Sequence, residues 1–460
     1  MILLAINWAS VGIQVAQLLL ALSILVVLHE FGHYITARWF GCRVEKFFLF
    51  FDPWFALVKK KIGDTVYGIG WLPLGGYVKI SGMIDESMDK EQLKLPPKEW
   101  EFRSKPAWQR LIVMLGGIIM NVLTAFIVYA FVLMIWGEKK IPAKSLKYGI
   151  QVTDSTLHKI GLRSGDKIIA VDGVPVDDFE KTLKKMIVSD EKITIDRNGQ
   201  IIDIKIPEDL LGQLIENKKR GRISLIEPRV PAMAFFIPDT SKIYKAGLRK
   251  NDQIIGVDSA RFQFYDELKN NLAEKKNKEV LLTVIRDKQE VQFKAHVDTE
   301  GRLGFYQYGV GPNYEQMDSL GWLKWNVTKY SFFAAFPAGI RKTGTTLSEY
   351  YEQFKKIVNP KTGGYKGVGG FKAIGSIFNP VWDWESFWNI TAFLSIILAF
   401  MNLLPIPALD GGHVMFTLYE MITRRKPNEK FLEYAQMAGM ILLLLLMLYA
   451  NGNDWFGWGK

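Results

Sequence analysis

The chain has 460 residues, of which 49% are hydrophobic and 23% are charged, and its formal net charge is +11. This length exceeds one compact core, so we expect several units, with apolar segments interleaved between soluble ones. Cys42 is the only cysteine, which excludes an intrachain disulfide and a cysteine-rich zinc site. We expect the basic excess to lie on solvated surface and against membrane lipid headgroups, and we expect no nucleic-acid partner.

Four apolar segments are long enough to cross a bilayer, which takes about 20 helical residues. The N-terminal segment has no basic region before it and no small-residue cleavage site ahead of His29, so it is not interpreted as a cleavable signal. The sequence therefore predicts a polytopic α-helical membrane protein with four transmembrane helices. We assign these helices to residues 1–36, 111–136, 386–412 and 434–452.

The first span ends in a group of ionisable residues, LHEFGHYITARWFG, at positions 28–41. His29 and His33 are four residues apart, so they share one face of a helix, with Glu30 beside them. His-Glu-x-x-His on a helix can hold zinc through both imidazoles while the glutamate acts as a general base. An unpaired ionisable group at membrane depth costs at least about 2.5 kcal/mol. A bound metal offsets this cost, which favours a catalytic site over histidines hydrogen-bonded in a helix bundle.

Residues 37–110 form the first loop, which is rich in lysine and arginine and is therefore expected in the cytoplasm. Within it, residues 64–82 read DTVYGIGWLPLGGYVKISG, a β-prone apolar stretch interrupted by glycines. We expect a membrane-associated β element there, with Gly68 and Gly70 at an edge strand that pairs with substrate. Simple turn residues are the equally supported alternative for these glycines.

The segment between the second and third spans contains an internal repeat. Residues 161–173 read GLRSGDKIIAVDG, and residues 247–259 read GLRKNDQIIGVDS. A helical stretch and then a strand follow each copy, which is a β-domain pattern. The repeat resembles tandem PDZ domains, which bind peptides by adding a strand to a sheet edge. We assign two α/β PDZ-like domains, at 142–230 and 231–308, which either bind peptides or protein C-termini or act only as a lid.

Residues 320–385 lead back to the membrane. TLSEYYEQFKKIV, at 346–358, places its apolar residues on one helical face, which suits a helix in the membrane interface. A soluble helix packed on the PDZ-like domains is the alternative. NPKTGGYKGVGGFKAIG, at 359–375, is too glycine-rich for a regular element and is predicted to be a mobile connector.

The third span ends in NLLPIPALDGG, residues 402–412. Catalytic zinc usually has three protein ligands and one open position, so two imidazoles leave it one ligand short. Pro405 and Pro407 break the helix and let the carboxylate of Asp410 turn into the bundle. Asp410 is therefore the predicted third ligand, and His413 is its rival. The basic loop at 413–433 is expected in the cytoplasm, which puts both termini and the repeat segment outside.

HEFGH at the end of the first span, together with NLLPIPALDGG at the end of the third, is similar to the site-2 protease family of intramembrane zinc metalloproteases. The tandem PDZ-like pair narrows the resemblance to the regulator of sigma-E protease (RseP) type. RSKPAWQRLIVMLGGIIMN, which ends at Asn121, resembles the entry to that group's second span, and the Gly68–Gly70 region resembles its membrane-associated β element.

This resemblance implies a Zn²⁺ site and a catalytic base in this chain, and a location in the bacterial inner membrane. The implied metal ligands are His29, His33 and Asp410, the implied base is Glu30, and the implied substrate-binding residues are Asn402 and Pro405. It also implies single-span membrane proteins as substrates, of the anti-sigma factor or remnant signal peptide type, with periplasmic PDZ-like domains and an active site toward the cytoplasm. The alternative is a non-catalytic, PDZ-bearing membrane scaffold, in which the histidines and acidic residues would be dispensable.

Overall fold

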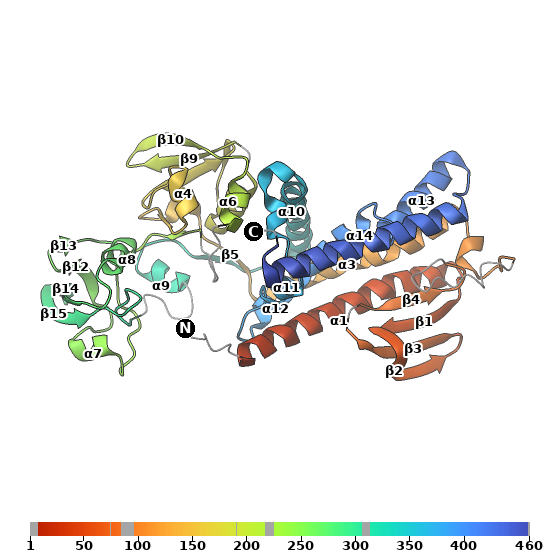
Figure 1. Cartoon of the computed structure of the whole chain (residues 1–460), viewed down its shortest axis with the longest axis horizontal. Helices are drawn as coiled ribbons and strands as arrows, with labels where there is room; N and C mark the ends of the chain where they lie inside the picture. The colour runs from red at the N-terminus through yellow and green to blue at the C-terminus, as the bar shows by residue number, and fades with distance from the viewer. Residues whose placement is uncertain are drawn as a thin grey trace. The chain divides into compact units, whose positions relative to one another are not determined.

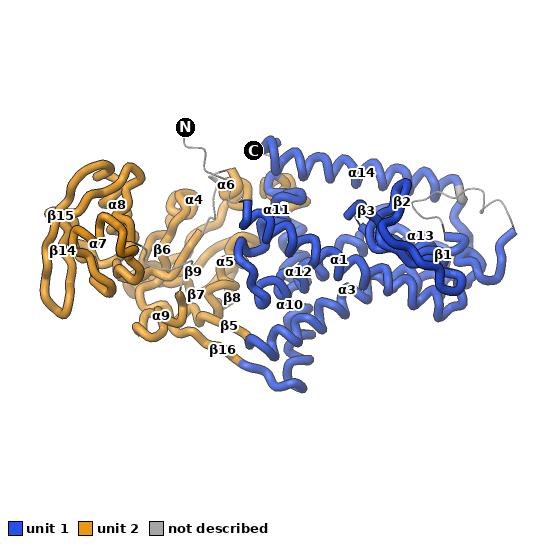
Figure 2. The backbone as a smooth tube through the Cα atoms, turned by 90° about the horizontal axis from the view of Figure 1, so that it is seen from below, with its two compact units in different colours: residues 1–137, 329–355, 366–460 blue, residues 138–328, 356–365 orange. Residues whose placement is uncertain are grey.

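The computed structural model describes residues 8–73, 75–83, 96–189, 191–216, 225–305 and 313–458. The chain divides into two compact units, coloured separately in Figure 2. Unit 1 comprises residues 1–137, 329–355 and 366–460, and unit 2 comprises residues 138–328 and 356–365. Parts of the predicted cytoplasmic loop (84–95) and of the predicted PDZ-like domains (190, 217–224 and 306–308) lie outside the described residues.

Among the described residues, four helices of unit 1 are long and apolar enough to cross a membrane. They are α1 (Trp8–Trp39), α3 (Ala107–Ile135), α12 (Trp384–Leu403) and α14 (Glu429–Phe456). Leu444, Leu445 and Leu448 of α14 are each more than half exposed, a surface that would be unfavourable in water. The helices therefore fit a membrane protein, in which lipid covers these side chains.

Helix α3 is the central element of unit 1, and it packs against α1, α12 and α13 (Asp410–Thr423). Figure 1 shows α1 and α3 running side by side. Gly32 and Gly116 face each other, and a Cβ on either would overlap the backbone of the other helix. Small residues at such a crossing let two backbones approach closely, because no side chains hold them apart.

The predicted β element is a four-stranded sheet in unit 1, with strand order β2-β3-β1-β4. Its strands are β1 (Val44–Leu49), β2 (Phe51–Ile62), β3 (Thr65–Leu72) and β4 (Tyr77–Ile80). β1 and β3 pair in parallel, and the other pairs are antiparallel. β1 and β4 are the strands that lie against α1.

The prediction that Gly68 and Gly70 lie on an edge strand is wrong, because β3 is paired on both sides. Gly68 lies opposite Phe48 of β1 and Lys59 of β2. A Cβ on Gly68 would overlap the Phe48 ring, and one on Gly70 would overlap the backbone of Phe51. These glycines therefore allow close packing inside the sheet, and the strand of the predicted stretch that lies at an edge is β4.

The two sequence repeats of unit 2 fold with the same topology. The first forms β7 (Lys167–Val171), β8 (Val174–Pro175), α5 (Phe179–Val188), β9 (Lys192–Arg197) and β10 (Gln200–Lys205). The second forms β12 (Gln253–Val257), β13 (Ala260–Arg261), α8 (Tyr265–Ala273), β14 (Glu279–Arg286) and β15 (Gln289–His296). The sheet orders, β8-β7-β9-β10 and β13-β12-β14-β15, correspond strand for strand.

Each repeat contains the same buried ion pair, which explains why its motif carries an aspartate. Arg197 donates two hydrogen bonds to Asp166 and one to the carbonyl of Gly161. In the second copy, Arg286 bonds Asp252 and the carbonyl of Gly247 in the same way. Both aspartates are only 1% exposed, and a buried carboxylate requires such a partner.

The core of the first repeat includes residues that follow the second repeat in the chain. Met317, Trp322 and Leu323 pack among the buried residues of the first copy. They lie in or after α9 (Tyr314–Ser319), and β16 (Asn326–Thr328) then pairs with β5 (Glu138–Lys140). The second repeat is thus inserted between the first repeat and its closing segment, whereas the sequence interpretation assigned residues 320–385 to the connection.

Shorter elements complete unit 2. β6 (Ile150–Val152) pairs with β11 (Ile226–Pro228), and the helices are α4 (Ser155–Lys159), α6 (Leu210–Glu216) and α7 (Lys242–Ala246). Arg229, between the repeats, pairs with Asp266 and Glu267 of α8 and lies 3.9 Å from the centre of the Phe264 ring. This cluster joins the two repeats.

The predicted amphipathic helix is part of α10 (Phe332–Val358). Its Tyr350 and Phe354 rings both lie 5.2 Å from the ring of Phe400 on α12, measured between centroids. Val358, on the same face, is 61% exposed. Part of the predicted apolar face therefore packs on an apolar helix of unit 1, and its placement in the membrane interface stays a prediction.

The prediction that residues 359–375 lack regular elements is wrong. The segment contains two short 3-10 helices (Pro360–Thr362 and Gly364–Gly367) and α11 (Phe371–Gly375). Asp454 of α14 accepts hydrogen bonds from the N–H groups of Gly370 and Ala373. A Cβ on Gly370 would lie 2.5 Å from the Asn451 side chain. A glycine here therefore lets this segment approach α14 closely.

Candidate metal centre

Two buried imidazoles on α1 share one helical face, as their spacing of four residues predicts. Nδ1 of His33 lies 2.8 Å from the carbonyl oxygen of Val113, and Nδ1 of His29 lies 3.0 Å from Nδ2 of Asn121. Both contacts come from α3. Each Nδ1 is thus engaged by α3, and the two Nε2 atoms lie 3.4 Å apart.

Gly117 of α3 makes room for these rings. A Cβ on Gly117 would overlap Nε2 of His33 and would lie 2.6 Å from Cε1 of His29. A glycine at this position therefore allows the two imidazoles to pack against α3.

Asp410 reaches the imidazoles because the chain turns sharply after α12. That helix ends at Leu403, and Asp410 is the first residue of α13, so the break lies where Pro405 and Pro407 predict it. Ala408 has a positive φ of 81°. A Cβ on Gly412 would lie 2.7 Å from the carbonyl oxygen of Ile406, so the turn depends on this glycine.

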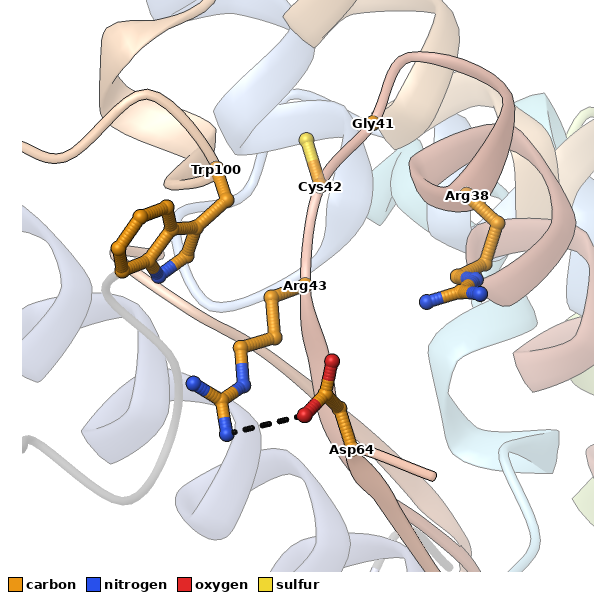
Figure 3. A pocket seen from close by; sticks show the side chains of 6 residues that line it. All are labelled: Arg38, Gly41, Cys42, Arg43, Asp64 and Trp100. Carbon is orange, nitrogen blue, oxygen red and sulfur yellow. Dashed lines mark ion pairs between the residues drawn. The ribbon is translucent and has the colours of Figure 1, made fainter. Parts of the chain in front are cut away.

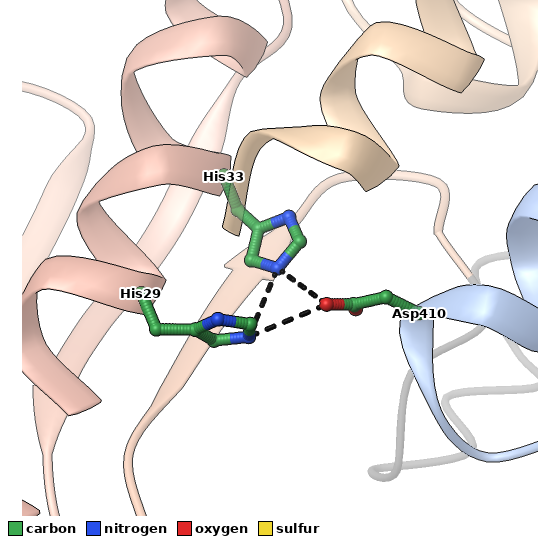
Figure 4. A group of neighbouring side chains, drawn as sticks. All are labelled: His29, His33 and Asp410. Carbon is green, nitrogen blue, oxygen red and sulfur yellow. Dashed lines mark hydrogen bonds and ion pairs between the residues drawn. The ribbon is translucent and has the colours of Figure 1, made fainter. Parts of the chain in front are cut away.

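The three predicted ligands converge on one point (Figure 4). Oδ2 of Asp410 lies 3.3 Å from Nε2 of His29 and 3.3 Å from Nε2 of His33. This oxygen is buried and accepts no hydrogen bond within the described part of the chain. Two imidazole nitrogens and one carboxylate, with a fourth position left open, are the ligand set of catalytic zinc, so the residues fit Zn²⁺.

Glu30 lies between the imidazoles and the sheet. Its carboxylate interacts with the backbone N–H of Val78 in β4, and electrostatically with both histidines and Asp410. Gly76, just before β4, is close enough that a Cβ there would lie 3.5 Å from Cγ of Glu30. The general-base candidate is therefore held between the ligand group and an edge strand.

The remaining predicted residues differ in their distance from the site. Nδ2 of Asn402 lies 3.4 Å from Nε2 of His29, so its amide faces the metal position. Gly68 and Gly70 lie inside the sheet, away from its β4 edge. His413 is outside the ligand group found among the described residues, and it lines a cavity of about 390 Å³ with Pro407 and Phe416.

Three residues of α3, Val113, Gly117 and Asn121, belong to the site although sequence reasoning assigned them no role in it. The sequence gives only a weak indication of their role. They are spaced by four residues, and Asn121 interrupts a mainly apolar stretch of α3, where an asparagine is costly without a partner.

A second hollow, of about 470 Å³, lies at the C-terminal end of α1 (Figure 3). Arg38, Cys42, Arg43, Asp64 and Trp100 are among the residues that line it. Its ion pair, between Arg43 and Asp64 at 3.4 Å, is solvent-exposed, and it contains none of the metal ligands. The candidate metal centre is therefore the group of His29, His33 and Asp410.

Comparison with known proteins agrees with this geometry. The model of peptidase family M50 matches residues 17–446. A protein of Treponema pallidum (strain Nichols) named "Putative zinc metalloprotease" is 27% identical over 459 residues, covering 94% of this chain and 96% of its own. The regulator of sigma-E protease RseP of Escherichia coli (strain K12) is 27% identical over 473 residues, covering 96% of this chain and 98% of its own.

Proposed function

Because the chain belongs to peptidase family M50, a family of zinc metalloendopeptidases, we propose that it hydrolyses peptide bonds in or near the transmembrane segments of single-span membrane proteins. The observation that carries the proposal is the place of the ligand group. His29, His33 and Glu30 lie on a helix that is itself apolar enough to cross a membrane. A non-catalytic scaffold would not account for this convergence of ligands.

The residues of the site divide the chemistry among them. His29, His33 and Asp410 would hold Zn²⁺, which would supply a Lewis acid for the scissile carbonyl and for water. Glu30 takes the proton of the attacking water and passes it to the nitrogen of the leaving amine. Asn402, whose amide faces the same position, donates a hydrogen bond to the substrate backbone. Pro405 contributes through the turn that places Asp410.

A substrate helix must unwind before its backbone can be attacked. In lipid, each freed N–H and C=O group costs several kcal/mol unless it finds a partner. Within the described residues β4 is an edge strand that pairs only with β1, so a further strand can add along its outer side, and its Val78 lies near Glu30. We propose that the substrate adds as a strand to β4. Its extended backbone would then lie beside Glu30, the general base.

The function is tested with a purified single-span reporter protein incorporated with the enzyme into lipid vesicles. Mass spectrometry of the products locates the cut. Cleavage within or at the border of the reporter span is expected, since the ligands lie on an apolar helix. Cleavage confined to soluble loops of the reporter would contradict the proposal.

Strand addition at β4 predicts a specific cross-linking pattern. In a Glu30→Gln background, Lys79→Cys on β4 is expected to form a disulfide with a cysteine in the reporter span. Val58→Cys, on the far edge strand β2, is the matched control and is expected to stay unlinked. The native thiol does not interfere, because Cys42 is buried and burial raises its pKa. Equal cross-linking of the reporter by Lys79→Cys and Val58→Cys would contradict the proposal that the substrate adds to β4.

We propose the bacterial inner membrane as the location, with the active site toward the cytoplasm and the repeats in the periplasm. The lysines and arginines at 37–110 and 413–433 support this orientation. The duplicated topology supports the assignment of the repeats as PDZ-like domains that bind peptides or protein C-termini, and that exclude substrates with bulky outer domains.

Removing the second repeat tests this exclusion. Deletion of residues 237–305 is expected to permit cleavage of reporters whose outer domain is intact, while trimmed reporters are cut as before. The deletion spares Phe235, Met317 and Trp322, which belong to the core of the first repeat. The measurement is the ratio of the cleavage rates of intact and trimmed reporters. An unchanged ratio would show that the second repeat does not exclude substrates with an intact outer domain.

A further inference from the structure

We propose that Asn121 is a positioning residue of the metal centre. Its carboxamide oxygen accepts the Nδ1 proton of His29 and thereby leaves Nε2 of that imidazole free to bind zinc. The inference rests on the proposed function, and it concerns how the protein prepares one ligand for the metal.

The side chain of Asn121 is completely buried beside His29. Its Nδ2 lies 3.0 Å from Nδ1 of the imidazole, and its Oδ1 is buried and accepts no hydrogen bond from the described residues. The nitrogen and oxygen of a carboxamide are assigned from the hydrogen-bond network, because the two atoms are nearly indistinguishable by shape. The amide can therefore be turned by 180° without moving any other group.

The two orientations have opposite consequences for His29. If Nδ2 donates to Nδ1, the imidazole proton must reside on Nε2, which then cannot bind a metal. If Oδ1 faces Nδ1, the proton resides on Nδ1 and the lone pair of Nε2 points at the metal position. The orientation in which Nδ2 faces Nδ1 leaves Oδ1 without a partner among the described residues, so the ligand role of Nε2 favours the other one. Metal-bound histidines generally donate their second N–H in this way.

The second imidazole is prepared from the same helix. Nδ1 of His33 lies 2.8 Å from the carbonyl oxygen of Val113, which can only accept, so the proton of His33 is on Nδ1. Val113, Gly117 and Asn121 are spaced by four residues and share one face of α3. That face offers a carbonyl acceptor, a gap for two rings and an amide acceptor, and it therefore sets both histidines in the same tautomer.

A purely structural role for Asn121 is the competing explanation. Its backbone carbonyl accepts a hydrogen bond of 2.8 Å from the hydroxyl of Ser395 on α12, so α3 and α12 are tied at this residue. That bond uses the main chain, which a substitution of the side chain leaves in place. The carboxamide itself has its only described contact with His29. The side chain can therefore be tested separately from the helix packing.

The test compares three variants of the purified full-length protein. Asn121→Leu removes the acceptor at similar volume, and Asn121→Asp keeps an acceptor and cannot donate. Thr124→Val is the matched control on the same helix, because within the described residues its buried hydroxyl bonds only the carbonyl of Met120. Zinc affinity is measured by competition with a chromophoric chelator, and the tautomer of His29 by ¹⁵N NMR of the imidazole.

Asn121→Leu is expected to weaken zinc binding by about 10–100-fold. Asn121→Asp is expected to bind zinc at least as tightly as the unaltered chain, with His29 protonated on Nδ1, and Thr124→Val is expected to be unchanged. Zinc binding by Asn121→Leu at the unaltered affinity would overturn the inference, as would equal weakening in the Leu and Asp variants. Failure of the unaltered chain to take up zinc would instead overturn the proposed function.

Discussion

Glu30→Gln is expected to lower kcat/KM for a reporter span by roughly 10²–10⁴-fold while the purified protein retains its zinc. Glutamine has the shape of glutamate, but its amide cannot take a proton from water. The candidate metal ligands are His29, His33 and Asp410, so the substitution changes none of them. Rates in lipid vesicles and zinc content by elemental analysis are the two measurements.

The same chemical change on a solvated loop provides the control for this variant. Glu99 is exposed and lies outside the site, so Glu99→Gln is expected to keep the full rate. Full activity in Glu30→Gln would remove the assignment of the general base. Loss of zinc in Glu30→Gln would show that the carboxylate holds the metal centre together.

Gly117→Ala is expected to abolish zinc binding and, with it, hydrolysis. The added Cβ would overlap Nε2 of His33 and press on Cε1 of His29, so both rings must shift from the positions in which their Nε2 atoms face Asp410. Displacement of a catalytic group by about 1 Å is enough to lower a rate by about 10²-fold, and overpacking costs about 1–3 kcal/mol in addition. Zinc content and the reporter cleavage rate are measured on the same preparation.

Gly12→Ala is the matched control, because it makes the same substitution on α1 where a Cβ would have no neighbour within 4 Å. It is expected to keep both zinc and activity. If Gly117→Ala bound zinc normally, the imidazoles would have to tolerate a methyl group in the place that the structure assigns to their rings.

Local spacing made the imidazole pair predictable. Residues four apart share one face of any helix, so His29 and His33 need no tertiary information to be placed together. Likewise, the prolines and glycines around Asp410 indicate a break whatever surrounds them. The apolar lengths of the four candidate spans and the duplicated motif of unit 2 are local in the same sense.

Strand order and helix contacts required the tertiary structure. The stretch at 64–82 does not reveal that β1 pairs in parallel with β3, so only the sheet shows that Gly68 is interior and that β4 is the edge. The roles of Gly117 and Asn121 likewise depend on which face of α3 meets α1. These contacts join residues that are far apart in the chain. The residue pattern within one segment does not indicate which distant segment it packs against. The sequence by itself thus determined which residues are candidate ligands of a metal, whereas the tertiary structure decided what surrounds and orients them.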